Sequence, residues 1–82
     1  MKLKFSKHAR ERIKQREISE NRVRNVINQP DSIIEEGHRK IFQSVIESDS
    51  GKMYLFRVFI NTNKNPNLII TVYRTSKIDK YL

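Results

Sequence analysis

Hydrophobic and polar residues in the first third of the chain follow the spacing of two helices. In each, a serine suited to the N-cap precedes side chains three or four positions apart, an arrangement that buries one face of a helix. The caps and stripes are Ser6 with Ala9, Ile13 and Arg16, and Ser19 with Val23, Val26 and Ile27. Pro30 ends the second pattern, because proline cannot donate the next helical hydrogen bond.

After Pro30 the hydrophobic period changes to two, which predicts strands. Four are expected, starting at Ile33-Ile34 and covering residues 40–47, 53–60 and 68–73. A turn at 36–38, a hairpin at 49–51 and a polar loop at 61–67 connect them, and 74–82 forms a basic tail. Residues 53–60 are almost continuously apolar, as in a central strand buried on both faces. This order predicts an α+β fold with two N-terminal helices on a four-stranded, mostly antiparallel sheet.

Length and composition narrow the classes of protein. With 82 residues, we expect one domain over 1–82. The chain has no Cys, which excludes disulfides, Cys-based zinc sites, thiol nucleophiles and iron–sulfur clusters. Residues 1–10 lack the apolar core of a signal peptide, and no apolar stretch approaches the roughly 20 residues of a membrane helix. We therefore expect a cytoplasmic protein with no membrane association.

The net charge of +8 is distributed unevenly. Residues 1–24 and 52–82 are strongly basic, whereas the intervening residues 25–51 are acidic. If the two basic ends meet in space, they create a one-sided positive field that attracts nucleic acid, an anionic membrane or an acidic protein. A charged surface that only maintains solubility is the alternative.

The sharpest polar pattern lies on the first predicted helix. His8, Arg12 and Arg16 are four residues apart, so their side chains line one face. On a helical wheel this face overlaps the buried stripe, which places the three side chains at the margin of the core. A guanidinium held there needs partners, because an unpaired buried charge is costly.

Two interpretations of this face remain open. In the structural one, Arg16 holds a sheet carbonyl or a carboxylate such as Glu35, and His8 only closes the edge of the core. In the functional one, the arginines bind a phosphate and His8 exchanges a proton near neutral pH. The position of His8 in the first helical turn, where free N–H groups attract phosphate, adds to the second interpretation.

A second polar pattern closes the chain. Strand alternation places Thr71, Tyr73 and Thr75 on one face, where hydroxyls can bind an anion and Tyr73 can stack a base. Ordinary strand formers followed by a solvated tail are the alternative. Arg57 interrupts an apolar strand, so it either reaches a functional face or pairs inside the sheet. The basic residues expected to contact nucleic acid are Lys4, Lys7, Arg57, Arg74 and Lys77.

Several kinds of site are missing from the sequence. Glu35 and Glu36 are neighbours on a strand and point to opposite faces, unlike a cooperating acid–base pair. Neither His8 nor His38 has a carboxylate at metal-ligand spacing, and there is no glycine-rich phosphate loop. We therefore expect no metal and no cofactor. RNA cleavage suits the remaining His, Arg, Lys and Tyr side chains, because the 2′-hydroxyl of RNA supplies the nucleophile.

Short motifs spread over nearly the whole chain resemble one family. They are His8-Ala9, Arg12, Arg16, Ile18, Gly37 and the ending Ile70-Thr71-Val72-Tyr73-Arg74, and they resemble domain of unknown function 4258, found in bacteria and phages. That family is similar to the small ribonuclease toxins of the RelE/ParE and colicin-type nuclease fold. The resemblance implies that His8, Arg12, Arg16 and Tyr73 occupy the family-motif positions. It leaves activity open, because the wider fold includes gyrase blockers and proteins that only bind partners.

These observations lead to one hypothesis and two alternatives. The hypothesis is a metal-independent ribonuclease, the toxin half of a toxin–antitoxin pair. His8 would act as general base or acid, Arg12 and Arg16 would bind the scissile phosphate, and Tyr73 would orient the 2′-hydroxyl or stack a base. RNA and an acidic antitoxin are the expected partners, and a homodimer is permitted. The alternatives are a noncatalytic basic module that binds nucleic acid or an acidic protein, and a dimerising domain with an exposed sheet edge.

Overall fold

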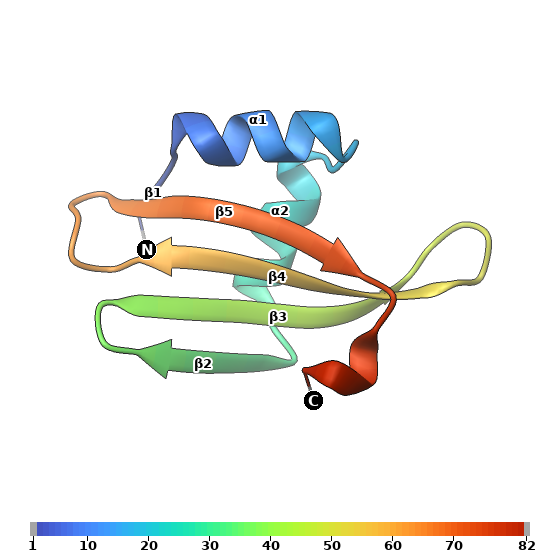
Figure 1. The fold of residues 1–82 in the computed structure, drawn as a ribbon. Helices are drawn as coiled ribbons and strands as arrows, with labels where there is room; N and C mark the ends of the chain where they lie inside the picture. The colour runs from blue at the N-terminus through green and yellow to red at the C-terminus, as the bar shows by residue number, and fades with distance from the viewer. Residues whose placement is uncertain (1, 82) are drawn as a thin grey trace.

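A computed structural model describes residues 2–81 and shows two helices packed against a five-stranded sheet (Figure 1). Helix α1 runs alongside strand β5, and α2 crosses one face of the sheet (Figure 1). The elements in chain order are β1 Leu3–Phe5, α1 Lys7–Gln15, α2 Glu20–Asn28, β2 Ser32–Glu36, β3 Arg39–Glu47, β4 Met53–Asn61, β5 Asn67–Thr75 and the 3₁₀ helix η1 Ile78–Lys80.

The sheet order is β1-β5-β4-β3-β2, so the expectation of four strands was wrong by one. The extra strand is β1, which pairs in parallel with the start of β5 through Leu3↔Asn67 and Phe5↔Ile69 and makes the sheet mixed. The other three pairings are antiparallel. A three-residue strand is too short to show a hydrophobic period, and its partner lies far away in the sequence. The α+β class and the two helices are confirmed.

Both helices begin at the predicted serine caps. The Ser6 hydroxyl accepts a hydrogen bond from the Ala9 amide at 3.0 Å, and the Ser19 hydroxyl accepts one from Arg22 at 3.0 Å. Between the helices, Glu17 adopts a left-handed conformation with φ of 54°. The turn is completed by the Ile18 amide, which donates to the Ile13 carbonyl at 2.8 Å. This short reversal sends α2 across the sheet while α1 stays beside β5.

The main core lies between the helices and one sheet face. It consists of apolar side chains from β1, both helices, the turn between them and the three central strands: Phe5, Ala9, Ile13, Ile18, Val23, Val26, Ile27, Phe42, Phe56, Val58, Ile60, Ile69 and Val72. The opposite face of the sheet is also partly buried from solvent. Ile41 and Leu55 are buried there outside that core cluster, and Gln43 is only 2% exposed. Burial on both faces of the central strand β4 is therefore confirmed.

The end of the chain differs from the expected tail. β5 continues through Arg74 to Thr75, and η1 follows it, so only part of the predicted tail lacks regular structure. The last tail residue, Leu82, lies outside the described residues, as does Met1. Within residues 2–81, no helix combines the length and the apolar character needed to span a membrane.

Candidate functional site

His8 and Arg12 form a contact pair on the outer side of α1. The Arg12 Nε–H donates a hydrogen bond to His8 Nε2 at 3.3 Å. Only an unprotonated ring nitrogen can accept such a bond, so this contact is one that a neutral imidazole makes. His8 is exposed and Arg12 is half-buried. The predicted spacing of four residues thus brings a proton acceptor and a guanidinium together at the surface.

Arg16, one turn further along α1, has a structural contact. Its Nη1 donates to the Val72 carbonyl of β5 at 2.9 Å. The carbonyl of Arg16 itself accepts a hydrogen bond from Arg74 Nη2 at 3.2 Å. The interpretation that Arg16 ties down a sheet carbonyl is therefore confirmed, whereas Glu35 pairs with Lys40 instead. The Arg16 guanidinium also lies 5.9 Å from the centre of the Tyr73 ring, which connects α1 to the predicted aromatic position.

Arg57 lies on the sheet face opposite the helices. Its Nε donates to Gln43 Oε1 at 3.0 Å across the β3–β4 pair. Aromatic rings surround its guanidinium, whose carbon is 5.2 Å from the centre of Phe59, 5.9 Å from Tyr73 and 4.4 Å from Tyr81. Arg57 therefore pairs within the sheet and at the same time contributes a cation to this second face.

Tyr73 is the centre of this aromatic group. Its ring stacks with Phe59 at a centroid distance of 6.4 Å and meets Tyr81 edge-on at 6.0 Å. Burial and hydrogen bonding with Tyr81 raise the pKa of Tyr73 above its ordinary value, against a smaller opposing effect of Arg57. The same hydrogen bond lowers the pKa of Tyr81. We refer to Arg57, Phe59, Tyr73 and Tyr81 as the aromatic–arginine cluster.

The remaining basic positions are spread along β5. Lys4 is opposite Leu68 at the start of β5, and Lys7 begins α1 nearby in the chain. Lys77 follows the other end of β5, where its amide donates to the Thr75 hydroxyl at 3.0 Å. All three side chains belong to exposed residues. These three predicted cations are therefore spread along the length of β5 instead of converging on one point.

Two members of this region were not identified from sequence. The sequence pattern places Tyr81 in a basic tail and Gln43 in an ordinary strand. A glutamine in the buried middle of a strand is an unusual feature that could have indicated a partner for Arg57. Nothing local indicates that Tyr81 returns to Arg57, since the two residues lie on different elements.

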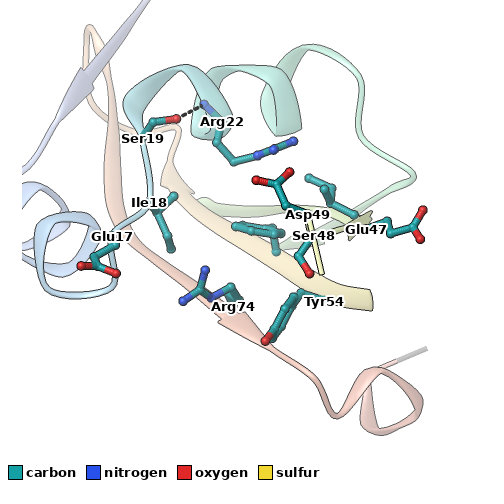
Figure 2. Close-up of a pocket in the computed structure, with 11 residues that line it drawn as sticks. Glu17, Ile18, Ser19, Arg22, Glu47, Ser48, Asp49, Tyr54 and Arg74 are labelled. Atoms are coloured by element: carbon teal, nitrogen blue, oxygen red, sulfur yellow. Dashed lines mark hydrogen bonds between the residues drawn. The ribbon is translucent and has the colours of Figure 1, made fainter. Parts of the chain in front are cut away.

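A groove of about 300 Å³ lies on the helix side of the sheet, between the α1–α2 turn and the β3–β4 hairpin (Figure 2). Among the predicted residues only Arg74 lines it, and its guanidinium lies 5.2 Å from the centre of the Tyr54 ring. Arg22 and Asp49 are also among the residues that line the groove (Figure 2). His8, Arg12, Arg16 and Tyr73 do not line this groove, so the predicted catalytic row lies outside it. Over residues 2–81, no three His, Asp or Glu side chains form a group that could hold a metal ion.

The structure defines a small α+β protein with a histidine–arginine row on α1 beside the edge of its sheet. Comparison with protein families shows the family to which this protein belongs. The chain belongs to the family described as domain of unknown function (DUF4258), which matches residues 5–74. The matched segment includes His8, Arg12, Arg16 and Tyr73 but ends before Tyr81. Neither curated proteins nor solved structures gave a significant match.

Proposed function

We propose that the protein is a metal-independent ribonuclease of the toxin type, which cleaves RNA through the substrate's own 2′-hydroxyl. The observation that supports this function best is the contact between His8 Nε2 and Arg12 Nε–H on an exposed helix surface. A neutral imidazole nitrogen is the group required to accept a proton from the 2′-hydroxyl near neutral pH. A guanidinium beside it is suited to hold the phosphate that this hydroxyl attacks.

The contact suggests how substrate would activate the site. A phosphate that binds Arg12 competes with His8 for the Nε–H donor, and its arrival frees the lone pair of His8 Nε2. The freed nitrogen then takes the proton as the 2′-oxygen bonds to phosphorus. The bond to the 5′-oxygen breaks, that oxygen takes a proton from solvent, and a 2′,3′-cyclic phosphate remains. Arg12 stabilises the charge that develops on the phosphoryl oxygens.

The other predicted residues take supporting roles in this proposal. Arg16 retains further N–H groups after its bond to Val72 and lies between Arg12 and Tyr73, where it can contact the same phosphate or its neighbour. Lys4 and Lys7 at one end of β5 and Lys77 at the other would steer the RNA backbone. An acidic antitoxin segment would bind the same basic surface. A relationship of the family to RelE/ParE-type toxins is part of this proposal.

The test is cleavage of RNA by the purified protein with a chelator present. Wild type should release fragments with cyclic-phosphate ends, and His8→Ala should lose about a hundredfold or more in rate, the usual contribution of a general base. The matched control is His38→Ala, because His38 is also exposed but lies at the β2–β3 turn. Equal rates for wild type and His8→Ala would overturn the role of His8.

A noncatalytic nucleic-acid-binding module is the second candidate. One observation favours this candidate: two arginines that were predicted to act on RNA already donate hydrogen bonds within the protein. Arg16 donates to the Val72 carbonyl, and Arg57 donates to Gln43 Oε1. Both candidates predict RNA binding that weakens as salt increases. They differ in turnover, so salt-sensitive binding without any RNA cleavage would select the binding module.

A further inference from the structure

The end of the chain returns to the sheet. After β5, residues 76–81 turn back, and η1 brings Tyr81 against the face opposite the helices (Figure 1). The Tyr81 ring centre is 4.4 Å from the Arg57 guanidinium carbon, the closest of the contacts between Arg57 and aromatic rings in the described residues. The ring thus covers a cation that the sequence had indicated as a contact for nucleic acid.

The Arg57 guanidinium is held in place from below. Gln43 fixes its Nε through a 3.0 Å hydrogen bond, while Phe59 and Tyr73 supply aromatic surface from the neighbouring positions of the sheet. Tyr81 is the only member of the aromatic–arginine cluster that does not come from a strand. The strand residues therefore form a preorganised platform of planar groups, and Tyr81 occupies the position above it.

Planar groups of this kind stack on nucleobases. Aromatic rings and arginine guanidinium groups are the usual platforms for unpaired bases, and they tolerate different sequences because every base has a π-face. A tyrosine ring above a guanidinium has the same flat shape and the same electrostatic preference as a base in that position. The contacts of Tyr81 are therefore ones that a base of single-stranded RNA could make in its place.

Tyr81 is held weakly enough to be displaced. It belongs neither to the core cluster nor to the side chains packed against that cluster. Among the described residues, the backbone hydrogen bonds of η1 are local, from the Lys80 amide to the Lys77 carbonyl at 3.4 Å and from the Tyr81 amide to the Ile78 carbonyl at 3.1 Å. Movement of Tyr81 away from Arg57 would leave the pairing of β3, β4 and β5 intact.

We propose that Arg57, Phe59 and Tyr73 form a stacking site for one unpaired nucleobase, and that Tyr81 occupies this site in the free protein. The identity of the ligand as RNA rests on the proposed function, but the site itself does not require catalysis. RNA would bind by exchanging Tyr81 for one of its bases. The C-terminal residues thereby lower the affinity of the free protein for RNA.

The test compares two fluorescent single-stranded oligonucleotides in an anisotropy titration. Both carry 2′-O-methyl groups, so that no cleavage can occur, and one of them lacks its bases but keeps the same phosphates. Tyr81→Ala should bind the base-containing strand about five- to tenfold more tightly than wild type, because a base no longer competes with the ring. The abasic strand should bind both proteins equally. Tyr81→Phe keeps the ring and loses only the hydroxyl, so as the matched control it should stay closer to wild type than Tyr81→Ala does.

A second variant tests the platform. In the Tyr81→Ala protein, Arg57→Ala should abolish the gain in affinity for the base-containing strand. This loss of affinity should exceed any loss that the same substitution causes for the abasic strand. Thermal unfolding of each variant establishes that the comparison is between folded proteins. Persistence of the full gain without Arg57 would overturn the assignment of the guanidinium to the stacking site.

The outcomes separate this proposal from the nuclease. If Tyr81→Ala gains base-dependent affinity and wild type cleaves no RNA, the stacking site stands and the ribonuclease proposal fails. If wild type cleaves RNA but Tyr81→Ala binds both strands like wild type, the stacking proposal fails alone. A loss of base-dependent affinity in Tyr81→Ala would show that Tyr81 contacts RNA directly, which also overturns it. Absence of binding by every variant at low salt overturns both.

Discussion

The side chain of Arg16 donates to the backbone carbonyl of Val72 across 2.9 Å and joins α1 to the edge of β5. Ser6 makes two similar bonds further along that edge, from its amide to Ile69 at 3.0 Å and from its hydroxyl to Ile70 at 3.1 Å. The contacts to Ile70 and Val72 occupy carbonyls beyond the last β1–β5 pair, Phe5↔Ile69. Arg16 therefore belongs to the row proposed to bind RNA, with His8 and Arg12, and also positions that row against the sheet.

We expect Arg16→Ala to destabilise the fold. A hydrogen bond from a charged donor contributes about 1.5–3 kcal/mol, and its removal also leaves the Val72 carbonyl without this partner. Urea unfolding should therefore show a free energy of unfolding lower by about that amount. Lys14→Ala is the matched control, since Lys14 is an exposed cation on the same helix. Equal stability of the two variants would contradict a structural role for Arg16.

Arg12→Ala should affect function without affecting stability. Arg12 bonds only to His8 among the described side-chain contacts, so its removal should change the free energy of unfolding by at most about 0.5 kcal/mol. Loss of a phosphate-binding guanidinium should reduce RNA cleavage by about tenfold or more. Cleavage rates and urea unfolding measured on the same preparation, with Lys14→Ala alongside, check both parts. An unfolded Arg12→Ala protein would argue against this assignment.

The two N-cap serines should differ in their contribution to stability. Ser19→Ala removes a cap and should cost about 1 kcal/mol. Ser6→Ala removes a cap and also the hydrogen bond to Ile70, so its cost should be larger by about 0.5–1.5 kcal/mol. Thermal or urea unfolding of the two variants gives the comparison directly. Equal losses would mean that the Ser6–Ile70 bond adds nothing beyond the cap.

The tyrosines of the aromatic–arginine cluster should ionise at different pH values. The pKa of Tyr81 is lowered and that of Tyr73 is raised, both relative to 10.0, so Tyr81 should lose its proton first. Absorbance of tyrosinate during an alkaline titration follows both events. Tyr81→Phe should remove the earlier phase and bring the pKa of Tyr73 closer to its ordinary value, because one cause of its increase disappears.

The same shifts give opposite dependences of stability on pH. The raised pKa of Tyr73 means that its protonated form favours folding, a contribution present below pH 10 and lost as pH rises through the folded-state pKa. The lowered pKa of Tyr81 favours its ionised form, so its contribution is present above pH 10 and lost as pH falls through its folded-state pKa. Unfolding of Tyr73→Phe across alkaline pH should lack the first effect.

Local features of the chain determined the helices and one half of the candidate site. Serine caps and apolar residues three or four positions apart act within a single turn, so Ser6 and Ser19 could be recognised without any tertiary information. The contact between His8 and Arg12 depends on the same regular spacing along α1. Alternation of apolar residues likewise indicated the three long strands.

Only the tertiary structure decided the contacts between distant segments. β1 exists because residues 67–69 offer an edge to pair with, and Arg16 is structural because Val72 lies beside it. Tyr81 lies over Arg57 because the chain reverses after β5, an event that no local period encodes. Spacing along the sequence determines contacts within one element, whereas contacts between elements depend on how the sheet and helices pack.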